Sequence, residues 1–236
     1  MDPGAVGPVD AGSARGQWTA VLLAGGRSSR FGSDKVLARL AGTRLVDLVL
    51  SAIPSDVPVI LVGPDPGSLP AWVRQVRETP AFGGPVAGIA AALPLIHTPL
   101  LGVIAADMPA AAGHLPGLVV SLLGNPGSDL DAVDESDDVG EPDACLPVDP
   151  SGRLQPLCGA YRVAAVARVI RQSGNPAGMA MRTIVDQLRV RAVPWPAQWT
   201  WDVDTPEDLR LGQDVLAVES NEGVGDQDRE AADGQG

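Results

Sequence analysis

Short apolar runs alternate with amphipathic stretches over the first half of the chain. The runs at 18–24 and 57–62 are followed by glycine, and the run at 100–105 is ended by Asp107-Met108-Pro109, as is typical of buried parallel strands that lead into loops. A shorter run at 73–76 predicts a further strand. Apolar positions recur at helical spacing over 45–53, and Pro54 ends that helix; 84–93 and 115–123 also predict helices. The alternation indicates βαβ units around a parallel sheet that is covered on both faces.

The pattern changes after residue 123. We expect strands at 144–148 and 154–161, joined by a turn at 149–152, then helices at 163–172 and 179–188 and a strand at 189–193. A last helix is expected to start at Thr205, which precedes a proline and two acids. The fold class predicted is α/β: a doubly wound, Rossmann-like, mostly parallel sheet. An inserted β segment in the second half is expected over the carboxyl edge of the sheet, on the acceptor side.

The net charge of −12 is confined to two segments. Residues 129–143 hold eight acids and no base, and residues 217–236 hold six acids and one arginine. Such composition is typical of solvated segments that do not fold. We therefore predict a disordered N-terminal extension (1–16), a domain over 17–216 with an acidic loop at 129–143, and a disordered acidic tail (217–236).

Several protein classes are excluded by composition. No apolar run reaches the roughly 18 residues of a membrane span, and the first residues lack the apolar core of a signal peptide. Cys145 and Cys158 match neither a zinc spacing nor a CxxC redox motif. The remainder of the chain is nearly neutral, with no basic stripe that would indicate nucleic acid. We expect a cytoplasmic protein that binds neither nucleic acid nor membrane.

The strongest candidate for chemistry is the segment 23–35, LAGGRSSRFGSDK. It leaves a predicted strand through Gly25 and Gly26, where backbone amides can approach a triphosphate without an intervening Cβ. It matches neither the Walker loop nor GxGxxG. The cations Arg30 and Lys35 follow, and Lys35 is the only lysine beside sixteen arginines. An ordinary turn with solvated arginines would share the glycines but not the whole segment.

Four further segments are candidates for a functional site. Asp107 follows a strand, where a hard cation would find carboxylate oxygen, although Asp-x-Pro alone is usually a turn. Gly84-Pro85 opens a helix that also contains Gly88, and these glycines alone would also fit close helix packing. The other two segments are 155–162, QPLCGAYR, and 202–209, DVDTPEDL.

Together these segments resemble the nucleotidyltransferase superfamily that transfers a nucleoside monophosphate onto a phosphate, through its LAGGxSxRxGxDK signature. The segments GPVAG, ADMP and DVDTPEDL extend the resemblance over residues 18–212, and GPVAG is similar to the GPLAG of molybdenum cofactor guanylyltransferases. The resemblance implies a nucleotide-diphospho-sugar transferase-like fold with Mg²⁺ held by Asp107, Asp202 and Asp204. It assigns catalysis to Arg30, Lys35 and Asp107. The implied nucleotide-binding residues are Leu23, Ala24, Gly25, Gly26, Lys35, Glu78, Gly84, Pro85, Gly88 and Asp107.

This chain departs from the guanylyltransferase pattern at two positions. The family often has Asn where this chain has Gly63 and Asp where it has Thr79, next to Glu78. Glu78 is the candidate substitute for that aspartate. The ending DVDT also occurs in related cytidylyltransferases, but these usually carry LAAG and lack GPLAG, so the resemblance favours guanine.

The implied reaction is the transfer of GMP from GTP to the phosphate of molybdenum-bound molybdopterin, with release of pyrophosphate. GTP and a molybdopterin-type acceptor are the implied partners, with transient contact to proteins of cofactor biosynthesis or to molybdoenzymes. A related NMP transferase (cytidylyl or other) acting on a different phosphorylated acceptor is the alternative within the enzyme class. A non-catalytic nucleotide-binding regulator is the alternative outside it.

The histidines and tryptophans are given structural roles. His97 and His114 lie apart, each beside a predicted loop, and are expected to be solvated structural residues. Trp195, Trp199 and Trp201 are expected to pack an edge of the core, since aromatic residues dominate cores. The alternative is that one of them stacks on a pterin. Cys158 is expected to be a small packed hydrophobic residue rather than a nucleophile.

Overall fold

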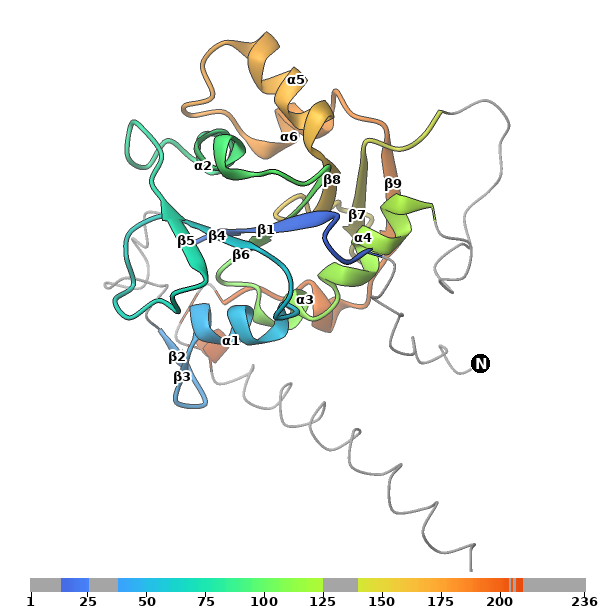
Figure 1. Ribbon diagram of the computed structural model, residues 1–236. Coiled ribbons are helices and arrows are strands. Elements are labelled where there is room, and N and C mark those ends of the chain that lie inside the picture. Colours follow the sequence, from blue (N-terminus) through green and yellow to red (C-terminus); the bar gives the residue numbers. More distant parts are fainter. Residues whose placement is uncertain (1–13, 26–37, 125–139, 204, 206, 210–236) are drawn as a thin grey trace, which may run out of the picture.

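A computed structural model describes residues 14–25, 38–124, 140–203, 205 and 207–209 of the chain. A seven-stranded sheet with the order β5-β4-β1-β6-β8-β7-β9 forms its centre (Figure 1). The strands are β1 (Trp18–Leu23), β4 (Val59–Val62), β5 (Val73–Val76), β6 (Leu100–Ala105), β7 (Ala144–Val148), β8 (Cys158–Arg162) and β9 (Val190–Pro194). A separate hairpin pairs β2 (Arg39–Leu40) with β3 (Thr43–Arg44).

Helices cover both faces of the sheet, as the alternating pattern predicts (Figure 1). On one face lie α1 (Leu45–Ala52), α3 (Pro109–Ala112) and α4 (Leu115–Leu123), over a core that includes Ala20, Leu22 and Leu61. On the other lie α2 (Pro85–Ala92), α5 (Val163–Ser173) and α6 (Met181–Val185), over Val21, Ile60 and Val103. Successive strand residues alternate between the two cores, so β1 and β6 are buried along their whole length.

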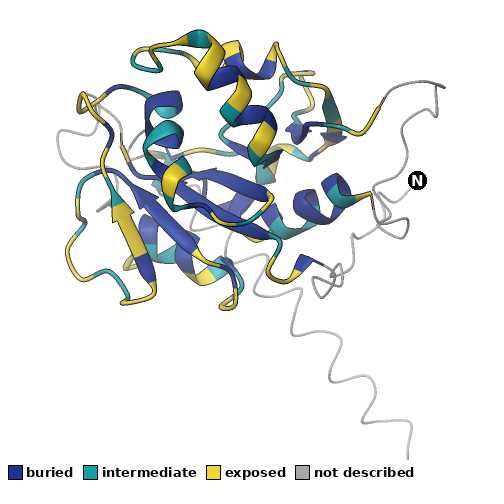
Figure 2. Cartoon of the chain, turned by 45° about the horizontal axis from the view of Figure 1, so that its top comes forward, coloured by how far each residue is buried: buried dark blue, intermediate teal, exposed yellow. Residues whose placement is uncertain are grey.

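The strand directions confirm a mostly parallel, doubly wound sheet. β5, β4, β1 and β6 are parallel neighbours, and β7 and β9 also pair in parallel. The β segment after the acidic loop lies in this same sheet, because β8 is inserted antiparallel between β6 and β7. Figure 2 shows the buried strands between the half-exposed helices, whereas the edge strand β5 is exposed at Arg74 and Gln75.

Two predicted elements are shorter than expected. The strand predicted from 154 begins only at Cys158, because residues 155–158 form a turn in which Cys158 N–H donates to the Gln155 carbonyl at 3.1 Å. Pro156 has no N–H for a strand ladder. The helix predicted over 179–188 spans only Met181–Val185, and the following N–H groups of Gln187 and Leu188 bond three residues back.

Four short elements were not predicted from the sequence: the β2–β3 hairpin, α3, and the 3₁₀ turns η3 (Leu93–Leu95) and η4 (Ala197–Trp199). Residues 207–209 of the last predicted helix are helical, and Thr205 lies in the capping position that the sequence predicts. Asp208 N–H donates to Thr205 Oγ1 at 3.2 Å, and Thr205 N–H donates to Asp208 Oδ2 at 2.6 Å, which is a reciprocal helix cap. No helix in the described part of the chain is both long and apolar enough to cross a lipid bilayer.

The end of the acidic segment is attached to the sheet. Asp143 is only 8% exposed, and its carboxylate accepts hydrogen bonds from the backbone N–H and the guanidinium of Arg189 at 3.1–3.2 Å. These hydrogen bonds hold the pKa of Asp143 below its usual value. Glu141 pairs with Arg162 at 2.9 Å. Residues 129–139 of the predicted loop, the tail 217–236 and residues 1–13 lie outside the described residues.

Candidate active site

The predicted site residues converge on one edge of the sheet. Because β5, β4, β1 and β6 are parallel, their carboxyl ends lie at the same edge, where open α/β sheets bind ligands. Leu23, Ala24 and Gly25 end β1, Glu78 follows β5, and Asp107 follows β6. Gly26, Arg30, Lys35 and Asp204, which the sequence also assigns to the site, lie outside the described residues.

Hydrogen bonds align the strand ends. Ala24 N–H donates to the Val62 carbonyl at 2.8 Å, and Ala106 N–H donates to the Leu23 carbonyl at 3.0 Å. The backbone of β1 is thereby held from both sides up to the start of the glycine turn. Gly25 itself is exposed, so its backbone is open to a ligand.

Gly63 passes very close to this turn. Its φ of +141° lies where other residues are strained, and a Cβ there would stand 2.9 Å from the Ala24 carbonyl carbon and 3.1 Å from Gly25 N. A side chain at position 63 would therefore push against the glycine turn. In this chain the close approach favours glycine at position 63.

Glu78 carries the most unusual carboxylate of the site. The residue is only 8% exposed, and Oε1 accepts the Phe82 N–H at 3.0 Å. Within the described residues Oε2 is buried without a hydrogen-bond partner. A Cβ built on Gly25 would be 3.6 Å from Oε1, so the carboxylate adjoins the end of β1. A buried carboxylate oxygen without a partner is costly, and a ligand donor in this place would relieve that cost.

The loop between Glu78 and α2 ends in two glycines, Gly83 and Gly84. A Cβ on Gly83 would be 2.9 Å from the Ala87 Cβ, and Gly84 has a φ of +87° as the residue before α2. Pro85 occupies the first turn of the helix, where its missing N–H costs nothing. Gly88 is buried within α2, where a Cβ would be 3.1 Å from Val62 Cγ1, so it allows the helix to pack closely on the sheet.

Asp107 and Asp202 come from distant segments that one hydrogen bond joins. Val203 N–H, next to Asp202, donates to the Asp107 carbonyl at 2.9 Å. The side chain of Val203 is fully buried with Leu40 and Leu45, and this packing holds the backbone next to Asp202 in place. Asp107 is half-buried and Asp202 is exposed, and the described residues contain no cluster of three or more metal-ligating side chains. The Val203 contact gave no signal in the sequence, because its two partners are 96 positions apart.

Two cysteines, two tryptophans and His114 are packed against the core. Burial raises the pKa of the Cys145 thiol to about 12 and raises that of Cys158 as well, so neither is a thiolate near neutral pH. Trp195 is buried and Trp199 packs against the same core, as expected for core aromatics. His114 contacts these two rings, and burial lowers its pKa, so it is less solvated than the sequence suggested.

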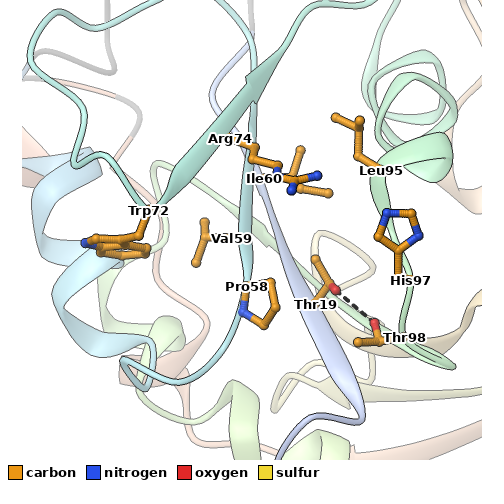
Figure 3. A pocket seen from close by; sticks show the side chains of 9 residues that line it. All are labelled: Thr19, Pro58, Val59, Ile60, Trp72, Arg74, Leu95, His97 and Thr98. Carbon is orange, nitrogen blue, oxygen red and sulfur yellow. Dashed lines mark hydrogen bonds between the residues drawn. The ribbon is translucent and has the colours of Figure 1, made fainter.

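A pocket lies at the opposite, amino-terminal edge of the same strands (Figure 3). In it Ile60 and Arg74 on the strands face Leu95 and His97, and the hydroxyls of Thr19 and Thr98 are 2.8 Å apart. Thr19 and Gly25 are six positions apart along the chain, and a strand rises roughly 3.3 Å per residue. None of the predicted site residues lines this pocket.

Comparison with known proteins identifies relatives with the same domain. Residues 20–191 match the model of the MobA-like NTP transferase domain. A protein of Trichormus variabilis named "Probable molybdenum cofactor guanylyltransferase" is 31% identical over 202 residues, which cover 83% of this chain and 90% of that protein.

Two solved structures show the same fold. Molybdopterin-guanine dinucleotide biosynthesis protein A from Archaeoglobus fulgidus has a TM-score of 0.58 at 22% identity, covering 85% of this chain and 99% of that one. The 2-C-methyl-D-erythritol 4-phosphate cytidylyltransferase from Thermus thermophilus has a TM-score of 0.55 at 19% identity, covering 84% and 98%. Both confirm the nucleotidyltransferase fold that the sequence predicts.

Proposed function

The chain belongs to the MobA-like NTP transferase family and is a nucleotidyltransferase; from that premise we propose that it transfers GMP from GTP to the phosphate of a molybdopterin-type acceptor. An oxygen of the acceptor phosphate attacks the α-phosphorus of GTP in line. The new O–P bond forms as the bond to the β-phosphate oxygen breaks, and pyrophosphate leaves. The acceptor phosphate is already ionised at neutral pH, so no side-chain nucleophile or general base is required.

The buried, unpartnered carboxylate oxygen of Glu78 is the observation that carries the choice of guanine. Guanine offers two adjacent donors, the ring N1–H and the exocyclic N2–H, whereas adenine and cytosine each offer only an exocyclic amine on that edge. Oε2 can accept one of these donors, and the second lone pair of Oε1 can accept the other while Oε1 keeps its bond to the Phe82 N–H. Gly25, whose added Cβ would be 3.6 Å from Glu78 Oε1, is exposed beside this carboxylate.

Catalysis in this proposal rests on position and charge. Arg30 and Lys35 hold the phosphates, as the family motif implies. Asp107 and Asp202, together with Asp204, would hold Mg²⁺, which neutralises phosphate charge when bound. The residues fit this ion, because Mg²⁺ prefers oxygen ligands and commonly binds one or two carboxylates plus substrate phosphates. The Val203–Asp107 hydrogen bond keeps the two acidic segments together.

A melting experiment tests the nucleotide. A ligand at a hundredfold excess over Kd stabilises the folded state by about 2.7 kcal/mol, and for a domain of this size each kcal/mol raises the Tm by roughly 2–4 °C. GTP with Mg²⁺ should therefore raise the Tm by several degrees, and ATP, CTP and UTP by less. Glu78→Gln should remove the preference for GTP, whereas Glu141→Gln, which changes an exposed acid, should keep it.

The same melting experiment with the four nucleotides distinguishes the alternative functions. A larger shift with CTP would favour a cytidylyltransferase, the second candidate, which the DVDT ending and the Thermus thermophilus structure support. Equal small shifts with all four nucleotides would contradict nucleotide transfer. Pyrophosphate release that requires the molybdopterin acceptor separates an enzyme from a regulator that only binds GTP, and identifies the acceptor.

The metal assignment has its own test. Asp107→Asn keeps the shape of the side chain and removes its charge, so Mg²⁺ should be needed at much higher concentration for both GTP binding and turnover. Asp202→Ala should behave in the same way. Asp56→Asn, an exposed acid paired with Arg15, is the control and should keep the wild-type titration. Wild-type Mg²⁺ titrations in both site variants would place the metal elsewhere.

A further inference from the structure

Three aromatic rings meet beside the candidate active site. His114, the residue before α4, stacks on Trp199 with ring centroids 3.7 Å apart and an interplanar angle of 23°. Trp195 stands edge-on to both rings, at 5.5 Å from His114 and 5.6 Å from Trp199. Burial lowers the pKa of His114, so near pH 7 this residue acts as a neutral ring.

Trp199 lies in the middle of a strap, residues 194–203, that runs from β9 past α3 toward α1 and the β2–β3 hairpin (Figure 1). The strap is fixed at both ends, where Trp195 N–H donates to the Val148 carbonyl and Val203 N–H to the Asp107 carbonyl, each at 2.9 Å. Ala197 and Gln198 are exposed. The ring of Trp199 is therefore the inward anchor between the two ends, and Asp202 follows it by three residues.

His114 is connected to Asp107 by a short, rigid path. α3 begins two residues after Asp107, and His114 N–H donates to the Ala111 carbonyl of that helix at 3.1 Å. Asp107, α3 and His114 thus form one continuous local unit. The His114–Trp199 stack joins this unit to the strap at a second point, independent of the Val203 hydrogen bond.

We propose that the His114–Trp199 stack is a positioning element that sets the placement of Asp202 relative to Asp107. Neither ring touches the substrate in this inference, so both are positioning residues. The inference rests on the proposed function, in which these two carboxylates hold Mg²⁺ beside the nucleotide. The stack adds a side-chain contact in the middle of the strap, between the backbone hydrogen bonds of Trp195 and Val203 at its two ends.

The test compares ring shape with ring chemistry at position 114. The measurement is the Mg²⁺ concentration that gives half of the GTP-dependent rise in Tm, with the Mg²⁺ dependence of kcat and KM as a second readout. His114→Ala removes the stack and should raise this concentration about threefold to tenfold, the range for one lost aromatic pair. His114→Phe keeps a flat ring and should restore the wild-type value. His97→Ala, at the opposite edge of the sheet, is the matched histidine control.

The outcomes separate this inference from the proposed function. If the wild type shows no Mg²⁺ dependence, the metal site is wrong and the inference falls with it. A Mg²⁺-dependent wild type with an unchanged His114→Ala titration overturns the inference alone. Equal losses in His114→Ala and His114→Phe also overturn it, because they would assign the effect to the ring nitrogens. If His114→Ala does not fold, Trp199→Leu and Trp199→Phe test the same stack from the strap. Trp199→Leu should raise the Mg²⁺ concentration and Trp199→Phe should restore it. An unchanged titration in Trp199→Leu, or equal losses in both variants, overturns the inference.

Discussion

The two edges of the parallel strands differ in how their polar groups are satisfied. At the amino edge, Thr98 Oγ1 donates to the Leu100 carbonyl at 2.8 Å, so the 2.8 Å contact with Thr19 must use the Thr19 proton. These hydroxyls bond to each other and to the backbone. At the carboxyl edge, Glu78 keeps a buried oxygen without a partner among the described residues, and Gly25 is exposed.

This difference distinguishes the pocket at the amino edge from the candidate site at the carboxyl edge. The pocket of Figure 3 lies at the edge where the described polar contacts are already made within the protein. The carboxyl edge has an unmet carboxylate, glycines that bring backbone close, and two acidic segments joined by a hydrogen bond. We expect changes at the carboxyl edge to affect chemistry and changes at the amino edge to affect only stability.

The largest effect is expected from Lys35→Ala. The only lysine of the chain is assigned to the triphosphate, and loss of one preorganised charge should lower kcat/KM by roughly a hundredfold or more. The measurement is pyrophosphate release with GTP and acceptor, with Arg74→Ala at the amino edge as the charge control. Unchanged turnover in Lys35→Ala would show that the lysine is incidental.

Gly63→Ala should lower both stability and activity. The added Cβ would stand 2.9 Å from the Ala24 backbone at a φ of +141°, and strain of this kind costs about 1–3 kcal/mol. We expect a Tm lower by roughly 2–12 °C and a weaker GTP-dependent Tm shift. Gly152→Ala, with a φ of +83° and open space around it, controls for the backbone strain alone. A GTP shift equal in both variants would contradict the role of the close approach.

Thr98→Val should lower stability without lowering activity. It leaves the Thr19 hydroxyl, on a residue 2% exposed, without its acceptor, which should cost about 1–3 kcal/mol. The Tm should fall, while kcat/KM stays at the wild-type value well below the Tm. The double variant Thr19→Val/Thr98→Val should recover part of the loss, because no hydroxyl is then left unpaired. A fall in kcat/KM together with the Tm would contradict the expectation that the amino edge affects only stability.

The smallest effect is expected from deletion of residues 217–236. This acidic segment is too polar to bury much surface, so the Tm and kcat/KM should stay nearly unchanged. Melting curves of the shortened and full chains at two salt concentrations provide the measurement. A fall of many degrees at low salt would mean that the tail docks on the body of the protein.

The sequence alone determined the elements whose residues are neighbours along the chain. β6, α4 and β7 have the predicted bounds, because apolar runs and periodicity depend only on local spacing. The family also followed from contiguous motifs, above all LAGGRSSRFGSDK, and the matched domain confirms it. The position of Asp107 at the carboxyl edge could be predicted from its place after a strand, since parallel strands bring their carboxyl ends together.

Only the tertiary structure decided how distant segments meet. The antiparallel insertion of β8 between β6 and β7 depends on hydrogen bonds across the sheet, which leave no local pattern. The same is true of the unpartnered oxygen of Glu78, which depends on what surrounds it, and of the stack of His114 on Trp199. Burial and hydrogen-bond pairing depend on residues that are distant along the chain and adjacent only after folding. A single sequence determines these contacts, but no local pattern in it shows them.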